Sequence, residues 1–177
     1  MSHRSASVLL LLSFGFLVGA CGDERSSYPR PPAPKASPVD SLQQRVAREP
    51  DNLDARLALA NLLFDNRRHR EAIAHYEVVL ARRAEDPNIR TDYATCLFDV
   101  GRKTEARSEY QRVIRAFPDH INARFNLAVL ENSERQFETA AELWETVAGM
   151  TEDPAVTAKA RQLAGEARRQ AATGGGR

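Results

Sequence analysis

Thiol, imidazole and carboxylate side chains are the groups in this sequence that could do chemistry. The 177-residue chain has two cysteines, Cys21 and Cys96, and two of its four histidines flank Glu71 in the stretch HREAIAH. A zinc-protease helix needs two histidines four residues apart, whereas His69 and His75 are six apart. No CxxC pair, glycine-rich phosphate loop or G-x-S-x-G motif is present. We therefore expect no enzymatic activity, no catalytic residue, no metal site and no cofactor.

The charge balance argues against nucleic acid as a partner. The chain has 25 basic and 24 acidic residues, and its arginines are scattered. A nearly neutral chain has no long-range field that would attract nucleic acid. We therefore expect no nucleic-acid partner, and since no catalytic motif is present we also expect no small-molecule substrate.

The first cysteine follows an apolar run from Val8 to Val18. Eleven residues are too few to span a bilayer, which takes about 20, but they fit the apolar core of a secretory signal. The stretch Val18-Gly19-Ala20-Cys21 resembles a bacterial lipobox, in which an aliphatic residue and two small residues precede the cysteine. The resemblance implies cleavage between Ala20 and Cys21, which would make residues 1–20 a lipoprotein signal peptide.

By the same resemblance, the Cys21 thiol takes a diacylglycerol and its freed amine takes a third chain such as palmitate. Each buried methylene contributes about 0.8 kcal/mol, so several chains would hold the protein on a membrane. Gly22, rather than an aspartate, follows the cysteine. This favours the outer membrane, facing the periplasm. An ordinary signal peptide with a free thiol at Cys21 is the alternative.

Residues 21–38 contain five prolines and therefore predict an extended tether. A proline-rich ligand for another domain is the alternative for this segment.

The rest of the chain repeats at a period of 34 residues, in the units 53–86, 87–120 and 121–154. Within a unit, the recurring apolar positions fall on one face of each of two successive helices. The recurring positions are Leu59, Tyr93 and Leu127; Ala60, Ala94 and Ala128; Ala72, Ala106 and Ala140; Tyr76, Tyr110 and Trp144; and Val79, Val113 and Val147.

This pattern resembles the tetratricopeptide repeat (TPR). The second unit matches the family pattern at Tyr93, Ala94, Leu97, Ala106, Tyr110 and Pro118. The resemblance implies an all-α solenoid of three helix-turn-helix repeats. Flanking it, we expect a short helix over 39–50, a capping helix over 155–171 and a disordered tail over 172–177.

Two positions inside the repeats carry their own expectations. The first large position of the family pattern is arginine in all three units, at Arg56, Arg90 and Arg124. We expect these side chains to cover apolar packing with their stems and to hold their charge in solvent. Cys96 lies among apolar residues of a first helix, so we expect a buried, inert thiol.

The TPR resemblance implies a concave groove lined by the first helix of each unit. Aromatic rings among amides suit an extended peptide, since rings give contact area and amides pair with backbone. The implied groove residues are Asp54, Leu57, Asn61, Phe64 and Asp65 in the first unit, Asn88, Thr91, Thr95, Phe98 and Asp99 in the second, and Asn122, Phe125, Asn126, Val129 and Asn132 in the third.

The groove lacks the lysines with which some TPR domains clamp a peptide's terminal carboxylate. Two aspartates, Asp54 and Asp92, stand at clamp positions and would repel such a group. We therefore expect a partner segment that carries lysine or arginine.

Three functional hypotheses follow. The first is a lipid-anchored, non-catalytic scaffold that binds a peptide or protein partner in the bacterial cell envelope. The second rests on the stretch AAELWETV, which loosely resembles periplasmic TPR proteins of cytochrome c biogenesis, and implies presentation of an apoprotein segment to a maturation enzyme. The third is dimerisation through an exposed end of the repeats.

Overall fold

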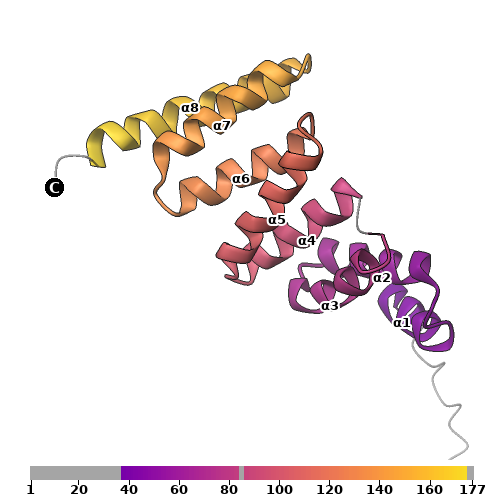
Figure 1. Cartoon of the computed structure of the whole chain (residues 1–177). Coiled ribbons are helices and arrows are strands. Elements are labelled where there is room, and N and C mark those ends of the chain that lie inside the picture. Colours follow the sequence, from indigo (N-terminus) through magenta and orange to yellow (C-terminus); the bar gives the residue numbers. More distant parts are fainter. Residues whose placement is uncertain (1–36, 84–85, 175–177) are drawn as a thin grey trace, which may run out of the picture. The chain divides into compact units, whose positions relative to one another are not determined.

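The structure, a computed structural model, describes residues 37–83 and 86–174. All regular secondary structure in these residues is helical, which confirms the all-α prediction (Figure 1). The predicted signal peptide, Cys21 and the linker up to residue 36 lie outside the described residues. The helices are α1 (Pro38–Arg48), α2 (Leu53–Asp65), α3 (His69–Leu80), α4 (Pro87–Asp99), α5 (Lys103–Ala116), α6 (Ile121–Ser133), α7 (Phe137–Met150) and α8 (Pro154–Gly174).

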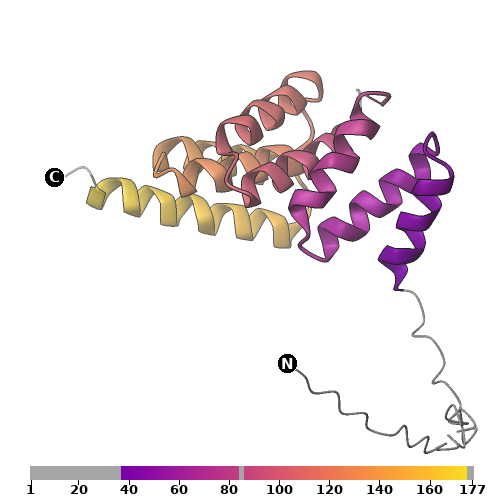
Figure 2. The same ribbon diagram turned by 90° about the horizontal axis from the view of Figure 1, so that it is seen from below.

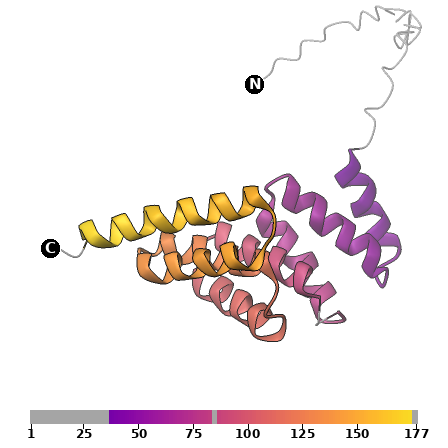
Figure 3. The same cartoon turned by 90° about the horizontal axis from the view of Figure 1, so that it is seen from above.

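Each helix packs against the next one along the chain. The pairs α2–α3, α4–α5 and α6–α7 each lie within one 34-residue unit, and α4 also contacts α6. The long helix α8 runs alongside α7, as Figures 2 and 3 show from two sides. The stack is therefore built by nearest neighbours, as in a solenoid.

The recurring apolar positions form the core. Fourteen of the fifteen are buried, and Tyr93 is half-buried with its hydroxyl donating to Glu77 Oε1 at 3.2 Å. The small alanines Ala60 and Ala72 have no exposed surface, so the two helices of a unit can approach closely. The buried side chains form two clusters, one over α1–α6 and one that reaches from α6 through α7 to α8.

The first helix of every unit ends in the same left-handed turn. The residues with positive φ are Arg67 (60°), Gly101 (86°) and Arg135 (62°), which are 34 residues apart. The residue after each one donates a backbone hydrogen bond to a carbonyl five residues earlier, as in Arg102 N to Leu97 O at 2.8 Å. This closes the helix end in the manner of a Schellman motif.

The first helices also begin alike. Asn52, Asp86 and His120 occupy equivalent positions before α2, α4 and α6, and each side chain accepts a hydrogen bond from a backbone N–H of the first turn. Asparagine and aspartate are common N-caps. His120 fills the same role with its Nδ1, which accepts from Ala123 N at 3.1 Å.

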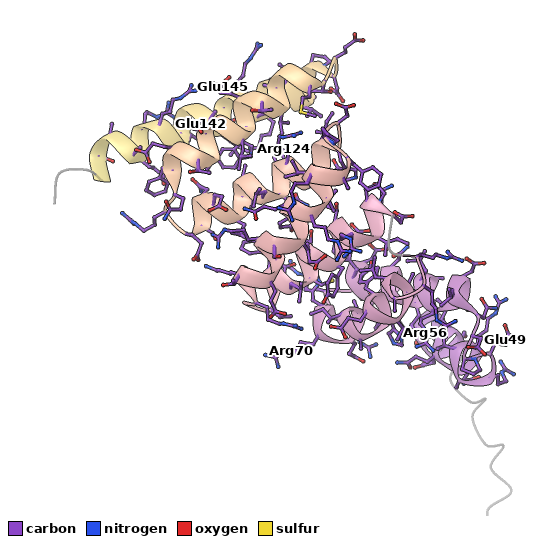
Figure 4. The ribbon with its side chains drawn as sticks, viewed as in Figure 1. Glu49, Arg56, Arg70, Arg124, Glu142 and Glu145 are labelled. Atoms are coloured by element: carbon purple, nitrogen blue, oxygen red, sulfur yellow. The ribbon has the colours of Figure 1, made fainter. Side chains whose placement is uncertain are left out.

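The three equivalent arginines differ from one another. Arg56 and Arg124 are half-buried and donate to the carbonyls of Pro50 (3.0 Å) and Pro118 (2.8 Å), which tie each helix to the turn before it (Figure 4). The expectation of a solvated charge is wrong for Arg90. Its side chain is 9 percent exposed and pairs with Glu109 at 2.5 Å, because the carboxylate on α5 compensates the buried guanidinium.

Two flanking helices differ in extent from the expected ranges. The first begins at Pro38, whose fixed φ suits a first helical position, behind the capping box of Ser37 and Asp40. The last continues to Gly174, into the expected tail, because Ala171 and Ala172 are good helix formers. Within the described residues, no helix combines the length and apolar character needed to cross a membrane.

Candidate functional site

The first helices of successive units present one surface, which we call the groove face. It consists of the exposed and half-buried side chains of α2, α4 and α6. It also includes the side chains of α8 that lie 34 residues after those of α6, at equivalent repeat positions. Two hydrogen bonds join α4 directly to the third unit. Asn126 Nδ2 donates to Thr95 Oγ1 at 3.2 Å, and His120 Nε2 lies 3.1 Å from Asn88 Oδ1. The boundary between the second and third units is therefore bridged by side chains on this face.

The predicted groove residues divide by exposure. The polar ones are mostly exposed, and the apolar ones are half-buried against the core. The exposed residues are Asp54, Asn61, Asp65, Asn88, Asp99 and Asn122; the half-buried ones are Leu57, Phe64, Thr95, Phe98, Phe125, Asn126, Val129 and Asn132.

Thr91 does not belong to this surface. It is 3 percent exposed, and its hydroxyl donates to Pro87 O at 2.7 Å within its own helix. A threonine hydroxyl that bonds back to its own helix has no donor left for a ligand.

Neighbouring Thr95 is the centre of a hydrogen-bond chain. Its Oγ1 donates to Thr91 O at 2.9 Å and lies 2.9 Å from the Tyr110 hydroxyl. With the bond from Asn126, the hydroxyl has all its partners. In the first unit, Asn61 at the equivalent position accepts from the Tyr76 hydroxyl at 2.9 Å.

The third unit lacks this hydrogen bond between a polar side chain and a tyrosine hydroxyl, and apolar residues occupy the equivalent positions. Val129 stands where Asn61 and Thr95 stand in the other units, and Trp144 replaces the tyrosine. The buried Trp144 indole Nε1 has no hydrogen-bond partner among the described residues. The ring packs against Phe125, with the two centroids 6.3 Å apart. The groove face therefore changes from polar to apolar along the stack.

Over the first two units, the groove face carries several aspartates. Asp92 is half-buried on α4, and no ion pair to it occurs in the described part of the chain. Burial, reinforced by the charges of Asp65 and Asp86, raises the pKa of Asp92 to about 6 from its ordinary 3.8. Asp65 comes from α2 and Asp86 caps α4. Three carboxylates from two units thus raise the local negative potential, and none of them forms an ion pair with a described residue.

The other aspartates of this region have partners. Asp54 accepts from Arg83 Nη2 at 2.7 Å, and Asp99 Oδ2 lies 3.1 Å from His69 Nε2. The first contact ties α2 to the turn after α3 within the first unit, and the second joins α3 to α4 of the next unit. Asp65 and Asp92 form no ion pair with a described residue and are the carboxylates open to a ligand.

His69 also contacts Cys96, so its imidazole lies between the Cys96 thiol and the Asp99 carboxylate. The Cys96 Sγ lies 3.7 Å from His69 Nδ1. Cys96 has no exposed surface, and burial raises the pKa of its thiol to about 12. A nucleophilic cysteine needs a lowered pKa and access to substrate. The three side chains therefore form a packing contact between the first and second units. The side chain of His69 is only 13 percent exposed, because it lies between Asp99 and Cys96 of α4.

An apolar pocket of about 360 Å³ lies between α6 and α8. Ile121, Phe125 and Val156 give it apolar walls, and Asn122 and Lys159 give it a polar rim; Ala155 completes the lining.

Sequence reasoning missed the contribution of α8, which it treated as a cap. Continuing the 34-residue period beyond 154 would have revealed it, because Val156, Lys159 and Leu163 take the positions of Asn122, Phe125 and Val129. None of the described histidine, cysteine, aspartate and glutamate side chains forms a group of three or more that could hold a metal ion.

Comparisons with known proteins agree with this architecture. Three tetratricopeptide-repeat family models match residues 33–85, 63–120 and 94–155. No curated protein matches the sequence.

Solved structures share the fold at low sequence identity. A MamA protein aligns with a TM-score of 0.64 and 17% identity over 75% of this chain and 72% of that one. YrrB, described as a TPR protein with an unusual peptide-binding site, aligns with a TM-score of 0.64 and 20% identity over 70% and 64%. The TPR2B domain of yeast Sti1, solved as a complex with pHsp70, aligns with a TM-score of 0.62 and 16% identity over 67% and 97%. The family models and the helical stack agree, and the chain is a tetratricopeptide repeat protein over residues 33–155.

Proposed function

We propose that this chain is a non-catalytic scaffold whose groove face binds a partner segment containing lysine or arginine. The observation that carries the proposal is the half-buried carboxylate of Asp92, whose charge is disfavoured by those of Asp65 and Asp86 and which forms no ion pair with a described residue. A lysine or arginine side chain placed there would remove this repulsion and form charge-assisted hydrogen bonds.

The surrounding surface supports a peptide rather than a small molecule. The exposed amides of Asn61, Asn88 and Asn122 recur along three helices, and amide groups can pair with the backbone of an extended segment. The half-buried rings of Phe64 and Phe98 offer apolar contact area beside them. YrrB and the Sti1 domain are described with peptide or protein ligands, which is consistent with this use of the fold.

We further propose that the protein works on a membrane in the bacterial cell envelope, held by acyl chains on Cys21. The support is the lipobox-like stretch Val18-Gly19-Ala20-Cys21 after an apolar run, followed by a proline-rich stretch of about 17 residues. A tether of this composition reaches roughly 50 Å at about 3.1 Å per residue, which would let the repeats meet a partner away from the bilayer surface.

Selection from a displayed library of random peptides, with the full-length chain as bait, tests the binding proposal. The enriched peptides are then titrated against the double variant Asp65→Asn/Asp92→Asn and against Asp119→Asn, which removes one charge from an exposed aspartate of an interhelical turn. We expect enriched peptides to carry lysine or arginine and to bind the double variant at least about tenfold more weakly. Enriched peptides without basic residues, or equal affinity for the double variant, would contradict the proposal.

A further inference from the structure

The polarity of the groove face changes along the stack, and its last part suits a different ligand chemistry from its first. Past the acidic units, α6 presents Ile121, Phe125 and Val129 at intervals of four residues, so that all three share one side of the helix. These side chains are half-buried against the second core cluster, as are Val156 and Leu163 of α8. The two helices therefore offer a strip of incompletely covered apolar surface.

The pocket between α6 and α8 opens within this strip. Its volume of about 360 Å³ is lined by apolar side chains on both helices. The Phe125 ring is backed by Trp144, which is 2 percent exposed. A pocket wall supported by a buried ring keeps its shape, so it can receive an apolar side chain without rearrangement.

One charged group stands at this pocket. Lys159 is exposed on α8, and it forms no ion pair with any described residue. None of the described residues that line the pocket carries a carboxylate. An ammonium group beside an apolar cavity favours a ligand that combines an apolar side chain with a carboxylate, and it disfavours a basic group at the same place.

We propose that this pocket binds a bulky apolar side chain of a partner segment while Lys159 pairs with an acidic side chain one or two residues away. The inference rests on the proposed peptide-binding function. It makes the partner segment bipolar, with basic residues over the acidic units and an apolar–acidic pair over α6 and α8. The apolar strip continues past the pocket at Val129 and Leu163, so the segment passes along it and the carboxylate comes from a side chain and not from a chain end.

The test uses a library in which random segments are displayed inside a loop, so that no free carboxyl terminus is present. The bait is the full-length chain. We expect enriched segments to contain Leu, Ile, Phe or Met within two residues of Asp or Glu. Synthetic peptides with blocked ends are then titrated against the wild type and Lys159→Glu, with Arg161→Glu as the matched control on the same helix.

The expected result is about tenfold weaker binding to Lys159→Glu and a change below about twofold for Arg161→Glu. A peptide whose acidic residue is replaced by lysine should bind Lys159→Glu more tightly than it binds the wild type. Because both variants change exposed side chains, far-ultraviolet circular dichroism should show both folded. A peptide with alanine in place of its apolar residue should lose binding to every form of the protein.

The outcomes separate this inference from the proposed function. Peptides that lose affinity for Asp65→Asn/Asp92→Asn but not for Lys159→Glu would overturn the pocket assignment and leave the function standing. A selected peptide that binds with a free carboxyl terminus but not with blocked ends would also overturn it. The reverse pattern, sensitivity to Lys159→Glu alone, would support the pocket and contradict the basic-segment proposal. Failure to enrich any segment would reject both.

Discussion

At the scale of the residue, Asp92 joins stability to binding. In the folded chain it ionises near pH 6, because burial and neighbouring carboxylates disfavour its charge. At pH 7 the folded state therefore holds a charge that costs free energy, and the cost falls as the pH is lowered from 6 towards 4. Residues that lower stability are frequent at binding sites, where a ligand offsets the cost.

We predict that Asp92→Asn raises the free energy of unfolding at pH 7 by about 1 kcal/mol, after allowance for solvent screening of this half-buried group. The gain should shrink as the pH falls from 6 towards 4 and vanish below about pH 3, where the wild-type side chain is protonated in both states. Chemical denaturation across this pH range measures it. An Asp92→Asn variant less stable than the wild type at pH 7 would show that the carboxylate has a stabilising partner.

The same residue sets the pH dependence of binding. A basic peptide needs ionised Asp92, so its affinity should fall as the pH drops from 7 to 5. For Asp92→Asn the affinity should be weaker and nearly flat over this range. Fluorescence polarisation of a selected peptide that contains no histidine reports both curves, and parallel curves for the two proteins would contradict the assignment.

His120 is the second residue whose ionisation affects the fold. Its Nδ1 accepts from the first turn of α6, which requires the neutral ring, and Nε2–H then donates to Asn88. Burial lowers the pKa of His120, although Asp86 opposes the shift. The unfolded chain therefore takes up a proton more readily, and stability falls as the pH drops below about 6.5.

We predict that His120→Asn removes this part of the acid destabilisation. Asparagine caps α2 at the equivalent position, so the variant keeps a cap at every pH, and the difference at pH 5 should be about 1 kcal/mol. Unfolding curves at pH 5 and pH 7.5 measure it. His75 contributes in the same direction in both proteins, so only the difference between them is informative.

At the scale of the element, substitutions in the three left-handed turns should change the free energy of unfolding by different amounts. Glycine adopts positive φ without strain, whereas arginine does so at a cost. Gly101→Ala should destabilise by about 1 kcal/mol although nothing lies within 4 Å of the added carbon. Arg67→Gly should stabilise by about 0.5 kcal/mol. Arg135→Gly should gain less, because Arg135 stacks 5.4 Å from the centre of the Phe137 ring. Thermal unfolding of the three variants ranks them, and a Gly101→Ala variant as stable as the wild type would contradict this ranking.

The terminal helix α8 covers the apolar face of α7. Ending the chain at Thr151 would expose Trp144 and Val147, and we expect α6 and α7 to lose most of their protection from hydrogen exchange. Because contacts in the stack run between neighbours, α2 and α3 should retain theirs. Uniform loss of protection over all helices would show that the stack unfolds as one cooperative unit.

The 34-residue period predicted the core because each buried position recurs as an apolar residue in all three units. What it could not predict depends on partners across units. Thr91 matches the groove positions of its neighbours in the pattern, yet its hydroxyl bonds back to Pro87 and the side chain is buried. Arg90 shares the position of Arg56, but only Arg90 meets a carboxylate on the following helix. The pocket at α8 could have been predicted only by treating α8 as the first helix of an incomplete fourth repeat that contributes to the groove face.

At the scale of the whole molecule, the proposal joins a membrane anchor to a binding surface. Cys21→Ala cannot form a thioether, so we predict that this variant leaves the membrane fraction. Cell fractionation with an antibody against the chain measures it, and Cys96→Ala is the matched control. Full retention of Cys21→Ala in washed membranes would contradict lipid anchoring but would leave the binding surface untouched.

The most direct test of the central claim, that the groove face holds the partner, is photocrosslinking in the native host. A photoreactive residue replaces exposed Asn61 on α2 or, as control, exposed Gln111 on α5. If the groove face holds the partner, position 61 captures a crosslinked partner whose crosslinked segment contains lysine or arginine, and this product is lost when Asp65→Asn/Asp92→Asn is added. The same partner captured equally from position 111, or capture from position 61 that the double variant leaves unchanged, would contradict this claim.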